Sequence, residues 1–381
     1  MYFNCFHLMP YPHLPADFQE NYESASLDIP NALYDPKVGS TLYADYIDEL
    51  VSAEAAGFDG VCVNEHHSSA YGLMPSPNLI AAALVQRTER VKIAVLGNAL
   101  PVRDHPLRIA EEIAMRDNMS KGRIISGFVR GIGYEYYAQG ITPTHSRERF
   151  EEAHDLIVKA WTETEPFQWY GKHYEFRYVN VWPRPYQDPH PPIWVPGSGS
   201  YESVKWAAQH GYTFLSVFAP TRVQKMWFDS FRKAADEVDR ELTSEQIGLS
   251  IPTFVAETDE EAHRRARVHM EWLFQIGLRI KREYYFPPGY TSKASLTNML
   301  KSGAKQFAHL SYDDLVKDGY ILVGSSNTVA EKLHAMGEDL GFGQLTATMQ
   351  VGSMGHREAL ENIARFGAEV IPLFDRAEAS A

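Results

Sequence analysis

The sequence predicts an α/β protein whose parallel strands form a (β/α)8 barrel. Three observations support this prediction. Short apolar segments alternate with amphipathic helical segments about eight times, polar or glycine-rich residues follow directly after several apolar segments, and no linker divides the chain in the middle. Such alternation is typical of a parallel sheet covered by helices. A length of 381 residues suits one barrel with insertions; a doubly wound open sheet is the alternative.

The composition restricts partners and location. A formal net charge of −13 argues against nucleic acid as the main partner, because phosphate binding needs a basic face. Cys5 and Cys62 fall in apolar segments, so we expect buried thiols and no disulfide. The N-terminal residues lack a signal-peptide pattern and no apolar run reaches transmembrane length. We therefore expect a cytoplasmic protein without membrane association.

The expected strands are short apolar runs bounded by turn residues, as is typical of strands buried on both faces. They cover residues 2–8, 58–64, 91–96, 123–129, 193–195, 214–217, 247–255 and 344–350.

Helices are expected between these strands, where apolar residues recur at spacings of three and four. Ser40 can cap the first helix and Gly57 can end it, while Pro106 suits the first turn of a later one. The further helices are expected at residues 78–87, 150–161, 200–209, 222–238, 328–340 and 357–373.

Two segments break the alternation and are expected as insertions after the fourth and seventh strands. Residues 169–182 alternate aromatic and polar side chains around Gly171, which predicts a β-hairpin. Residues 258–320 begin with a charged helix and continue into an aromatic, proline-rich stretch at 284–290. We expect residues 258–320 to form a mobile lid on a single barrel domain that covers residues 1–381.

The first motif whose side chains could take part in catalysis is Asn64-Glu65-His66-His67, directly after an apolar strand. Catalytic residues of barrels lie at the carboxyl ends of strands, so one histidine is a candidate for the active site, and the other can simply pack and form hydrogen bonds. Adjacent side chains of an extended strand point to opposite faces. His66 and His67 are therefore not expected to share a metal ion, and no metal site is predicted.

Two further motifs suit a phosphate group. Arg130-Gly131 follows the fourth strand, where the guanidinium and exposed backbone N–H groups can bind phosphate oxygens. Gly199-Ser200 opens a helix, and the N–H groups at a helix N-terminus attract anions. Each motif alone also fits an ordinary turn. Together, at one end of a barrel, they favour a single bound phosphate.

The third strand ends in Leu96-Gly97-Asn98. Glycine permits unusual backbone geometry, so Gly97 and Asn98 are candidates for contact with a planar ligand, with an ordinary turn as the alternative.

Taken together, these residues resemble the bacterial-luciferase-like family of flavin-dependent monooxygenases. The resemblance covers nearly the whole chain, in family order and at family-like spacing. Its segments are Gly57-Phe58-Asp59 with Glu65-His66-His67, Met119-Ser120-Lys121-Gly122-Arg123 with Arg130-Gly131, and Ser200 with Trp206-Ala207-Ala208.

The resemblance implies that FMN binds at the carboxyl ends of the barrel strands. It implies that His66 is catalytic, that Arg130 and Ser200 hold the FMN phosphate with help from the Gly199 backbone, and that a non-prolyl cis peptide lies near Gly97. Luciferase has a reactive cysteine at the position of Val129 and a glutamate at that of Gly199. These departures argue against light emission and leave the FMN site intact.

The implied reaction uses reduced FMN and O2, through a flavin C4a-peroxide, to oxidise a small organic substrate. His66 would hydrogen-bond the peroxide or move a proton. No NAD(P)H fingerprint is visible, so a separate flavin reductase is the expected partner. Tyr11, Tyr71 and Tyr136 are candidates for the substrate site, and family habit implies a homodimer.

Three alternatives stay open. One is an F420-dependent hydride-transfer oxidoreductase of the same superfamily, and another is a flavin-binding protein without turnover. The third is a metal-dependent barrel hydrolase built on Glu65, His66 and His67, which the alternation of strand side chains disfavours.

Overall fold

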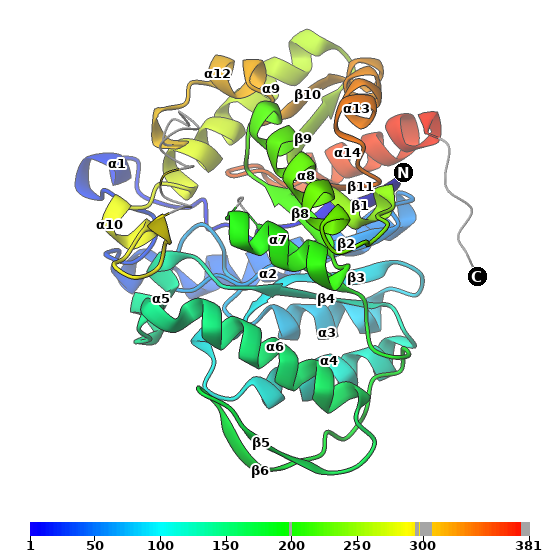
Figure 1. Ribbon diagram of the computed structural model, residues 1–381. Helices are drawn as coiled ribbons and strands as arrows, with labels where there is room; N and C mark the ends of the chain where they lie inside the picture. The colour runs from blue at the N-terminus through cyan, green and yellow to red at the C-terminus, as the bar shows by residue number, and fades with distance from the viewer. Residues whose placement is uncertain (198–199, 294–296, 298–306, 375–381) are drawn as a thin grey trace.

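The computed structural model describes all residues except 198–199, 294–296, 298–306 and 375–381. Eight parallel strands close into a barrel, because β8 pairs with β7 on one side and with β9 on the other (Figure 1). The predicted (β/α)8 barrel is confirmed. Its strands are β1 (Tyr2–Phe6), β2 (Gly60–Val63), β3 (Lys92–Ala99), β4 (Ile124–Val129), β7 (Ile193–Gly197), β8 (Thr213–Val217), β9 (Ile247–Ala256) and β11 (Gln344–Thr348).

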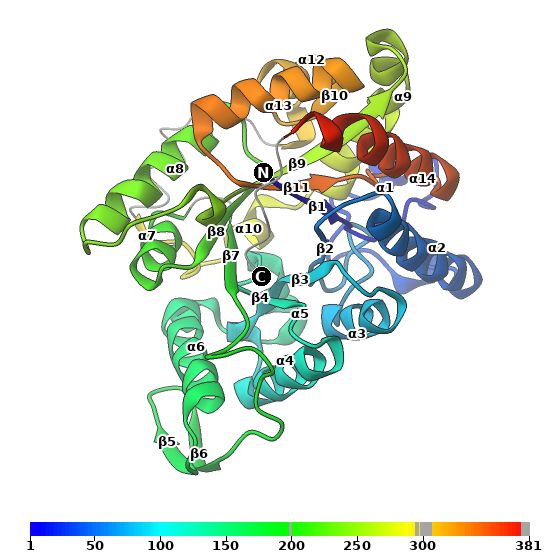
Figure 2. The ribbon, with the colours of Figure 1, turned by 90° about the vertical axis from the view of Figure 1, so that its right-hand side faces the viewer.

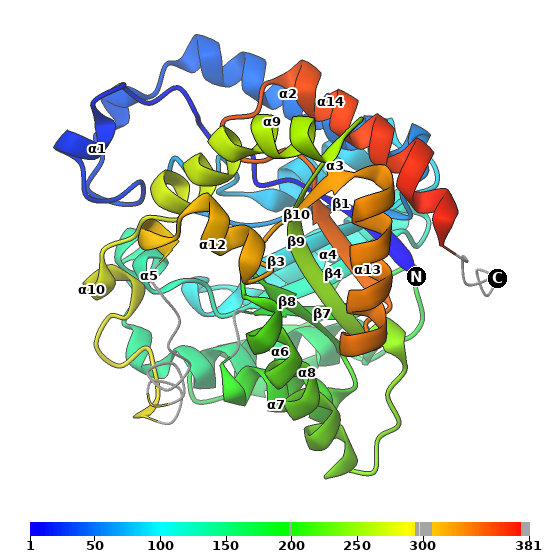
Figure 3. The same cartoon turned by 90° about the horizontal axis from the view of Figure 1, so that it is seen from above.

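Helices surround the strands in an outer ring (Figure 2). The ring closes where the last helix packs against the first, as Figure 3 shows for α14 and α2. The ring helices are α2 (Pro36–Ala55), α3 (Pro77–Arg87), α4 (Pro106–Ser120), α6 (Ser146–Thr162), α7 (Tyr201–His210), α8 (Thr221–Asp236), α13 (Ser326–Leu340) and α14 (His356–Arg365).

The expected start of the first ring helix at Ser40 was wrong. The helix begins at Pro36, and the Asp35 side chain caps it by accepting a hydrogen bond from the Lys37 backbone N–H at 2.8 Å. An aspartate cap followed directly by proline is a strong start signal. The preceding loop also contains a short helix, α1 (Phe18–Asn21).

The insertion after β4 contains the predicted hairpin, formed by β5 (Phe167–Tyr170) and β6 (Glu175–Val179). Figure 1 shows this hairpin projecting below α6. A short helix, α5 (Gly133–Gln139), precedes it and was not expected from the sequence. It places side chains against the cavity described below.

The insertion after β9 contains α9 (Asp259–Glu271), which continues as a π-helix over Trp272–Gly277. It continues with α10 (Arg282–Tyr285), α12 (Tyr312–Lys317) and an unexpected strand, β10 (Leu322–Ser325), that pairs with the end of β9 outside the closed barrel. Residues 294–296 and 298–306 of the expected lid lie outside the described residues.

Cys5 and Cys62 are buried free thiols, as expected. Burial raises the pKa of both thiols. Among the helices of the described residues, none combines the length and apolar character needed to cross a bilayer.

The approach of β3 to β4 depends on two glycines. A Cβ atom at Gly127 would lie 2.0 Å from the Val95 carbonyl oxygen, and one at Gly97 would lie 2.6 Å from the Gly127 carbonyl. A cis peptide bond joins Leu96 to Gly97, so the expectation for this turn is confirmed.

We expect Gly127→Ala to lower the melting temperature of the protein, because the added methyl group meets backbone that cannot rotate away. Overpacking of this kind costs about 1–3 kcal/mol or more. The matched control is Gly337→Ala in α13, where a Cβ meets only Met1 Cε at 3.5 Å. That variant gains helix propensity of up to about 1 kcal/mol and is expected to melt higher. Equal melting temperatures for the two variants would contradict the packing argument.

Candidate functional site

A cavity of about 1320 Å³ opens at the carboxyl ends of the barrel strands. This volume exceeds the roughly 300–1,000 Å³ of a pocket for one small molecule. Five of the residues proposed from the sequence line it together: His66, Tyr71, Gly97, Arg130 and Ser200. Residues from distant parts of the chain meet here, as parallel barrels require.

Four other candidates lie elsewhere or cannot be placed. Tyr11 is buried beneath the N-terminal loop, where its hydroxyl accepts a hydrogen bond from the Asp35 backbone N–H at 2.9 Å. Tyr136 is buried behind the cavity wall and donates to the Arg130 carbonyl at 2.5 Å. Neither is among the lining residues, so neither is positioned to touch a substrate. Gly199 lies outside the described residues.

Asn98, the fourth, is fully buried beside the cavity wall. Both polar atoms of its amide lack a hydrogen-bond partner. A buried amide in this state carries a substantial desolvation cost, which a bound ligand or water can relieve.

His66 follows β2 and is held on both ring nitrogens. Its Nδ1 lies 3.1 Å from Glu135 Oε1, and its Nε2 lies 2.8 Å from the Asn64 amide nitrogen. A carboxylate only accepts hydrogen bonds, so with Asn64 donating to Nε2 the ring proton lies on Nδ1. The ring packs on Tyr71 with centroids 4.5 Å apart. Both ring nitrogens of this histidine are therefore engaged, and the ring is held in one orientation.

Glu135 is the residue near His66 that the sequence analysis missed. It comes from α5 and is only 1 % exposed. Its Oε2 accepts from the Ile132 backbone N–H at 2.7 Å, so the carboxylate also caps the helix that carries it. Gly131 has φ +80°, and a Cβ there would lie 2.8 Å from Glu135 Oε2. The glycine after Arg130 thus leaves room for the carboxylate that orients His66.

His67 belongs to a separate network. It donates from Nε2 to Glu65 Oε1 at 2.8 Å, and Arg103 bonds the same oxygen at 2.8 Å. Glu65 Oε2 accepts from the Ala99 N–H at 3.3 Å, at the end of β3. The two histidines therefore bind different carboxylates, Glu135 for His66 and Glu65 for His67.

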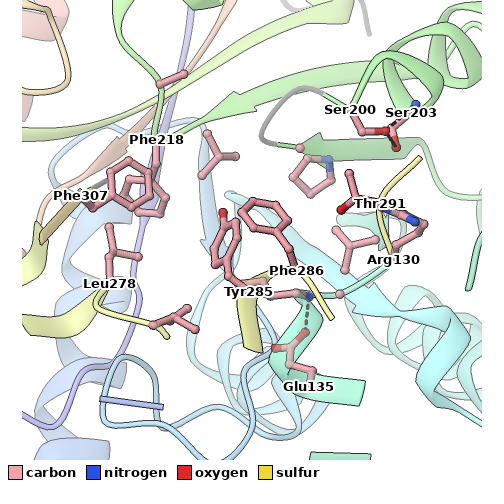
Figure 4. Close-up of a pocket in the computed structure, with 18 of the residues that line it drawn as sticks. Arg130, Glu135, Ser200, Ser203, Phe218, Leu278, Tyr285, Phe286, Thr291 and Phe307 are labelled. Carbon is pink, nitrogen blue, oxygen red and sulfur yellow. Dashed lines mark hydrogen bonds between the residues drawn. The ribbon is translucent and has the colours of Figure 1, made fainter. Parts of the chain in front are cut away.

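A cationic group lies at one end of the cavity, where Figure 4 shows Arg130 near Ser200 and Ser203. Arg130 donates from Nη1 to the Ser146 hydroxyl at 3.2 Å and to the Tyr290 carbonyl at 3.0 Å, and its guanidinium lies 4.4 Å from the Tyr290 ring centroid. Arg147 donates to the Ser200 hydroxyl at 3.1 Å. Two guanidinium groups therefore converge near the N-terminus of α7.

Ser200 is the N-cap of α7 and accepts from the Ser203 N–H at 3.2 Å. Burial lowers the pKa of Arg147, and the neighbouring charge of Arg130 lowers it further. Like charges at a helix N-terminus are unfavourable unless an anion lies between them. Arg130, Arg147 and Ser200, hereafter the anion cradle, suit a group with two negative charges.

Arg147 was not identified from the sequence. It lies in the first turn of α6, where the helix dipole disfavours a cation. A basic residue at a helix N-terminus is unfavourable without an anion nearby, and this feature of the sequence could have identified Arg147.

The cavity fits a flavin mononucleotide in three respects. The anion cradle suits its phosphate, the walls beyond the cradle are largely apolar, and Asn64, which lines the cavity, has an amide oxygen without a hydrogen-bond partner. Polar atoms of a planar heterocycle are suitable partners for such amides.

Comparison with known proteins gives a match to one family profile, described as luciferase-like monooxygenase, over residues 31–344. An uncharacterized protein, y4wF, from Sinorhizobium fredii is 33% identical over 241 residues, which cover 62% of this chain and 69% of the relative. The oxygenase component of a flavin-dependent trigonelline monooxygenase from Acinetobacter baylyi is 24% identical over 350 residues, 90% of this chain and 93% of the relative.

Solved structures share the fold. The oxygenating constituent of 3,6-diketocamphane monooxygenase from Pseudomonas putida, a type II Baeyer–Villiger enzyme in complex with FMN, aligns with a TM-score of 0.74 and 22% identity over 98% of both chains. An F420-dependent secondary alcohol dehydrogenase aligns with a TM-score of 0.68 and 17% identity over 97% of this chain and 98% of the other. At these identities the likeness shows the fold.

We expect inorganic phosphate to raise the melting temperature of the protein, because an anion bound in the cradle stabilises the folded state; the gain is about 1.4 kcal/mol at ten times Kd. Arg147→Met keeps the length of the side chain and removes its charge, so most of this shift should be lost. Arg108→Met, at an exposed position on α4, is the control and should keep it. If phosphate raised the melting temperature of Arg147→Met and wild type equally, the anion would bind elsewhere.

Proposed function

We propose that this chain, which belongs to the family of luciferase-like monooxygenases, is the FMN-dependent oxygenase of a two-component system that oxidises a small organic substrate with O2. The observation that carries the proposal is that the anion cradle and an oriented, buried histidine line the same large cavity. The name of the relative from Acinetobacter baylyi, an oxygenase component, supports the two-component arrangement.

In this proposal the anion cradle holds the FMN phosphate. Arg130 uses Nη1 for Ser146 and Tyr290, which leaves its other N–H groups for phosphate oxygens. Ser200 and Arg147 complete the contact, and the N-terminus of α7 adds a favourable dipole. Gly97 lines the cavity beside the ring system, and the buried amide of Asn98 lies directly behind it in the chain.

Bound reduced flavin would supply the activation of O2, which protein side chains cannot perform. His66 holds or moves a proton beside the reacting atoms, the role that histidine most often takes in general acid–base catalysis. Glu135 keeps the ring oriented through Nδ1, and Asn64 does so through Nε2. Both partners are buried, which limits the freedom of the ring to turn away.

We also propose that the insertion after β9 acts as a lid that excludes water. Its described residues Tyr285, Phe286 and Tyr290 line the cavity. The Tyr290 hydroxyl donates to the Gly131 carbonyl at 2.5 Å, which ties the segment to the turn that carries Arg130.

Two partners belong to the proposal: a separate reductase that supplies reduced FMN, and a second copy of the chain. Exposed apolar side chains on α3 and α4 support a homodimer. They are Leu79, Met115 and Met119, of which Leu79 is 71% exposed.

The test is a screen of candidate organic substrates with reduced FMN and O2, read by the mass of the product. We expect one added oxygen atom and, for His66→Ala, a loss of coupled product of about a hundredfold or more, with FMN affinity within about threefold of wild type. His67→Ala should lose less, because that ring bonds Glu65 instead. Full coupled oxidation by His66→Ala would refute the role of His66.

The F420-dependent alternative has an opposite outcome in the same screen. It requires tight binding of F420 and product formation that does not depend on O2.

The protein mixed with NADH and FMN alone is expected to leave NADH unoxidised, and addition of a flavin reductase should start product formation. The absorbance of NADH measures this directly. Rapid NADH oxidation by the chain itself would contradict the two-component proposal.

A further inference from the structure

The cavity has two chemically different ends. Figure 4 shows Arg130, Ser200, Ser203 and Thr291 at one end, and Phe218, Leu278 and Phe307 at the other, with Tyr285 and Phe286 between them. The volume of about 1320 Å³ leaves room for a second molecule beside a cofactor anchored in the cradle. The end away from the cradle therefore needs its own explanation.

The far end is an aromatic wall built around one buried ring. Phe274, in the π-helix after α9, is fully buried and does not line the cavity. Three lining rings pack edge-to-face against it: Phe307 at 5.7 Å, Tyr320 at 5.9 Å and Phe218 at 6.1 Å between centroids. Each such pair adds rigidity beyond simple burial. The wall is thus preorganised without a ligand.

Phe218 takes its place in this wall at a conformational cost. It follows β8 with φ +50°, a region that bulky side chains rarely adopt. Such a conformation persists only where the surroundings enforce it, and it is concentrated at ligand sites. The backbone of β8 therefore bends so that a phenyl ring, which is only partly buried, faces the cavity.

The wall residues carry no charge. Leu278 lines the cavity with these rings, and the Tyr320 hydroxyl is the polar atom of the wall. Phe218, Leu278 and Phe307 offer no hydrogen-bond donor or acceptor on their side chains, so a charged group placed against them would lose its hydration without compensation. Apolar and aromatic surfaces, in contrast, gain free energy by contact with these rings.

We infer that Phe218, Leu278 and Phe307 form the substrate subsite and that it selects a neutral, largely apolar molecule that contains a ring. This inference rests on the proposed function, because the cofactor must occupy the cradle end for the far end to receive the substrate. Phe218 is the specificity-determining residue of the subsite, and Phe274 is a positioning residue that holds it.

The experiment compares two probes of similar shape, indole and indole-3-carboxylate, by calorimetry on the full chain with and without oxidised FMN. With FMN bound, so that the cradle is occupied, indole is expected to bind about tenfold or more tightly than the anion. Phe218→Gly should weaken indole binding about tenfold, the equivalent of losing one ring contact. Tyr170→Ala, which removes an exposed ring on the β5–β6 hairpin, is the control and should change nothing.

Stability separates a binding role from a purely structural one. At φ +50°, glycine is unstrained whereas alanine is strained, so Phe218→Gly should melt at or above Phe218→Ala, the reverse of the usual order. If Phe218→Gly melts at or above Phe218→Ala and still loses indole affinity, the loss of affinity comes from the missing ring contact and not from unfolding.

Tighter binding of indole-3-carboxylate to the FMN-loaded chain, or unchanged indole affinity in Phe218→Gly, would overturn the inference. Failure of the proposed function has a different signature. If FMN does not bind but indole binds and depends on Phe218, the cofactor assignment fails and the subsite stands. If FMN binds and indole does not, the subsite fails alone.

Discussion

Eight parallel strands can close into a barrel only with all their carboxyl ends at one rim, and the site depends on this constraint. Pairing of β8 with β9 completes the closure. Residues that follow β2, β4 and β7 then share one cavity: His66, Arg130 and Ser200 are far apart in sequence but line the same space. Gly97 and Gly127 contribute at the level of the backbone, since no other residue allows β3 and β4 to approach so closely.

The carboxylates near the rim leave the positive charge of Arg130 and Arg147 available to a ligand. The nearest buried carboxylate to the turn after β4 is Glu135, but the Ile132 N–H and the His66 ring occupy its oxygens. Glu202 is a second carboxylate at the cradle, where its Oε2 accepts from the Ser200 hydroxyl at 3.3 Å and lies 3.7 Å from the Arg147 guanidinium. A carboxylate bound tightly to the guanidinium groups would neutralise them. Because Glu135 is engaged with the histidine and Glu202 lies beyond hydrogen-bond distance of Arg147, cationic charge remains for an anion.

Much of the fold and part of the site could be predicted from the sequence, because their signals are local. Strand composition, the motif at His66 and the Arg130 turn each occupy a few consecutive residues. The parts that were missed depend on contacts between distant segments. Glu135 matters only because α5 places it against His66, and Phe274 only because three other segments supply rings around it. Tyr136 and Tyr71 were both chosen as aromatic residues near the expected site. Tyr71 lines the cavity, whereas Tyr136 does not.

One insertion reaches both ends of the cavity, and this makes the ends interdependent. Tyr290 supplies a carbonyl and a ring to Arg130, while Leu278, earlier in the same segment, belongs to the apolar wall. Between them, α10 packs on Gly133, where a Cβ would lie 2.4 Å from the Tyr285 carbonyl oxygen. A ligand in the cradle that shifts Tyr290 therefore acts on the segment that carries Leu278. Thermodynamic linkage then requires that a substrate at the wall change the affinity of the cradle by the same factor.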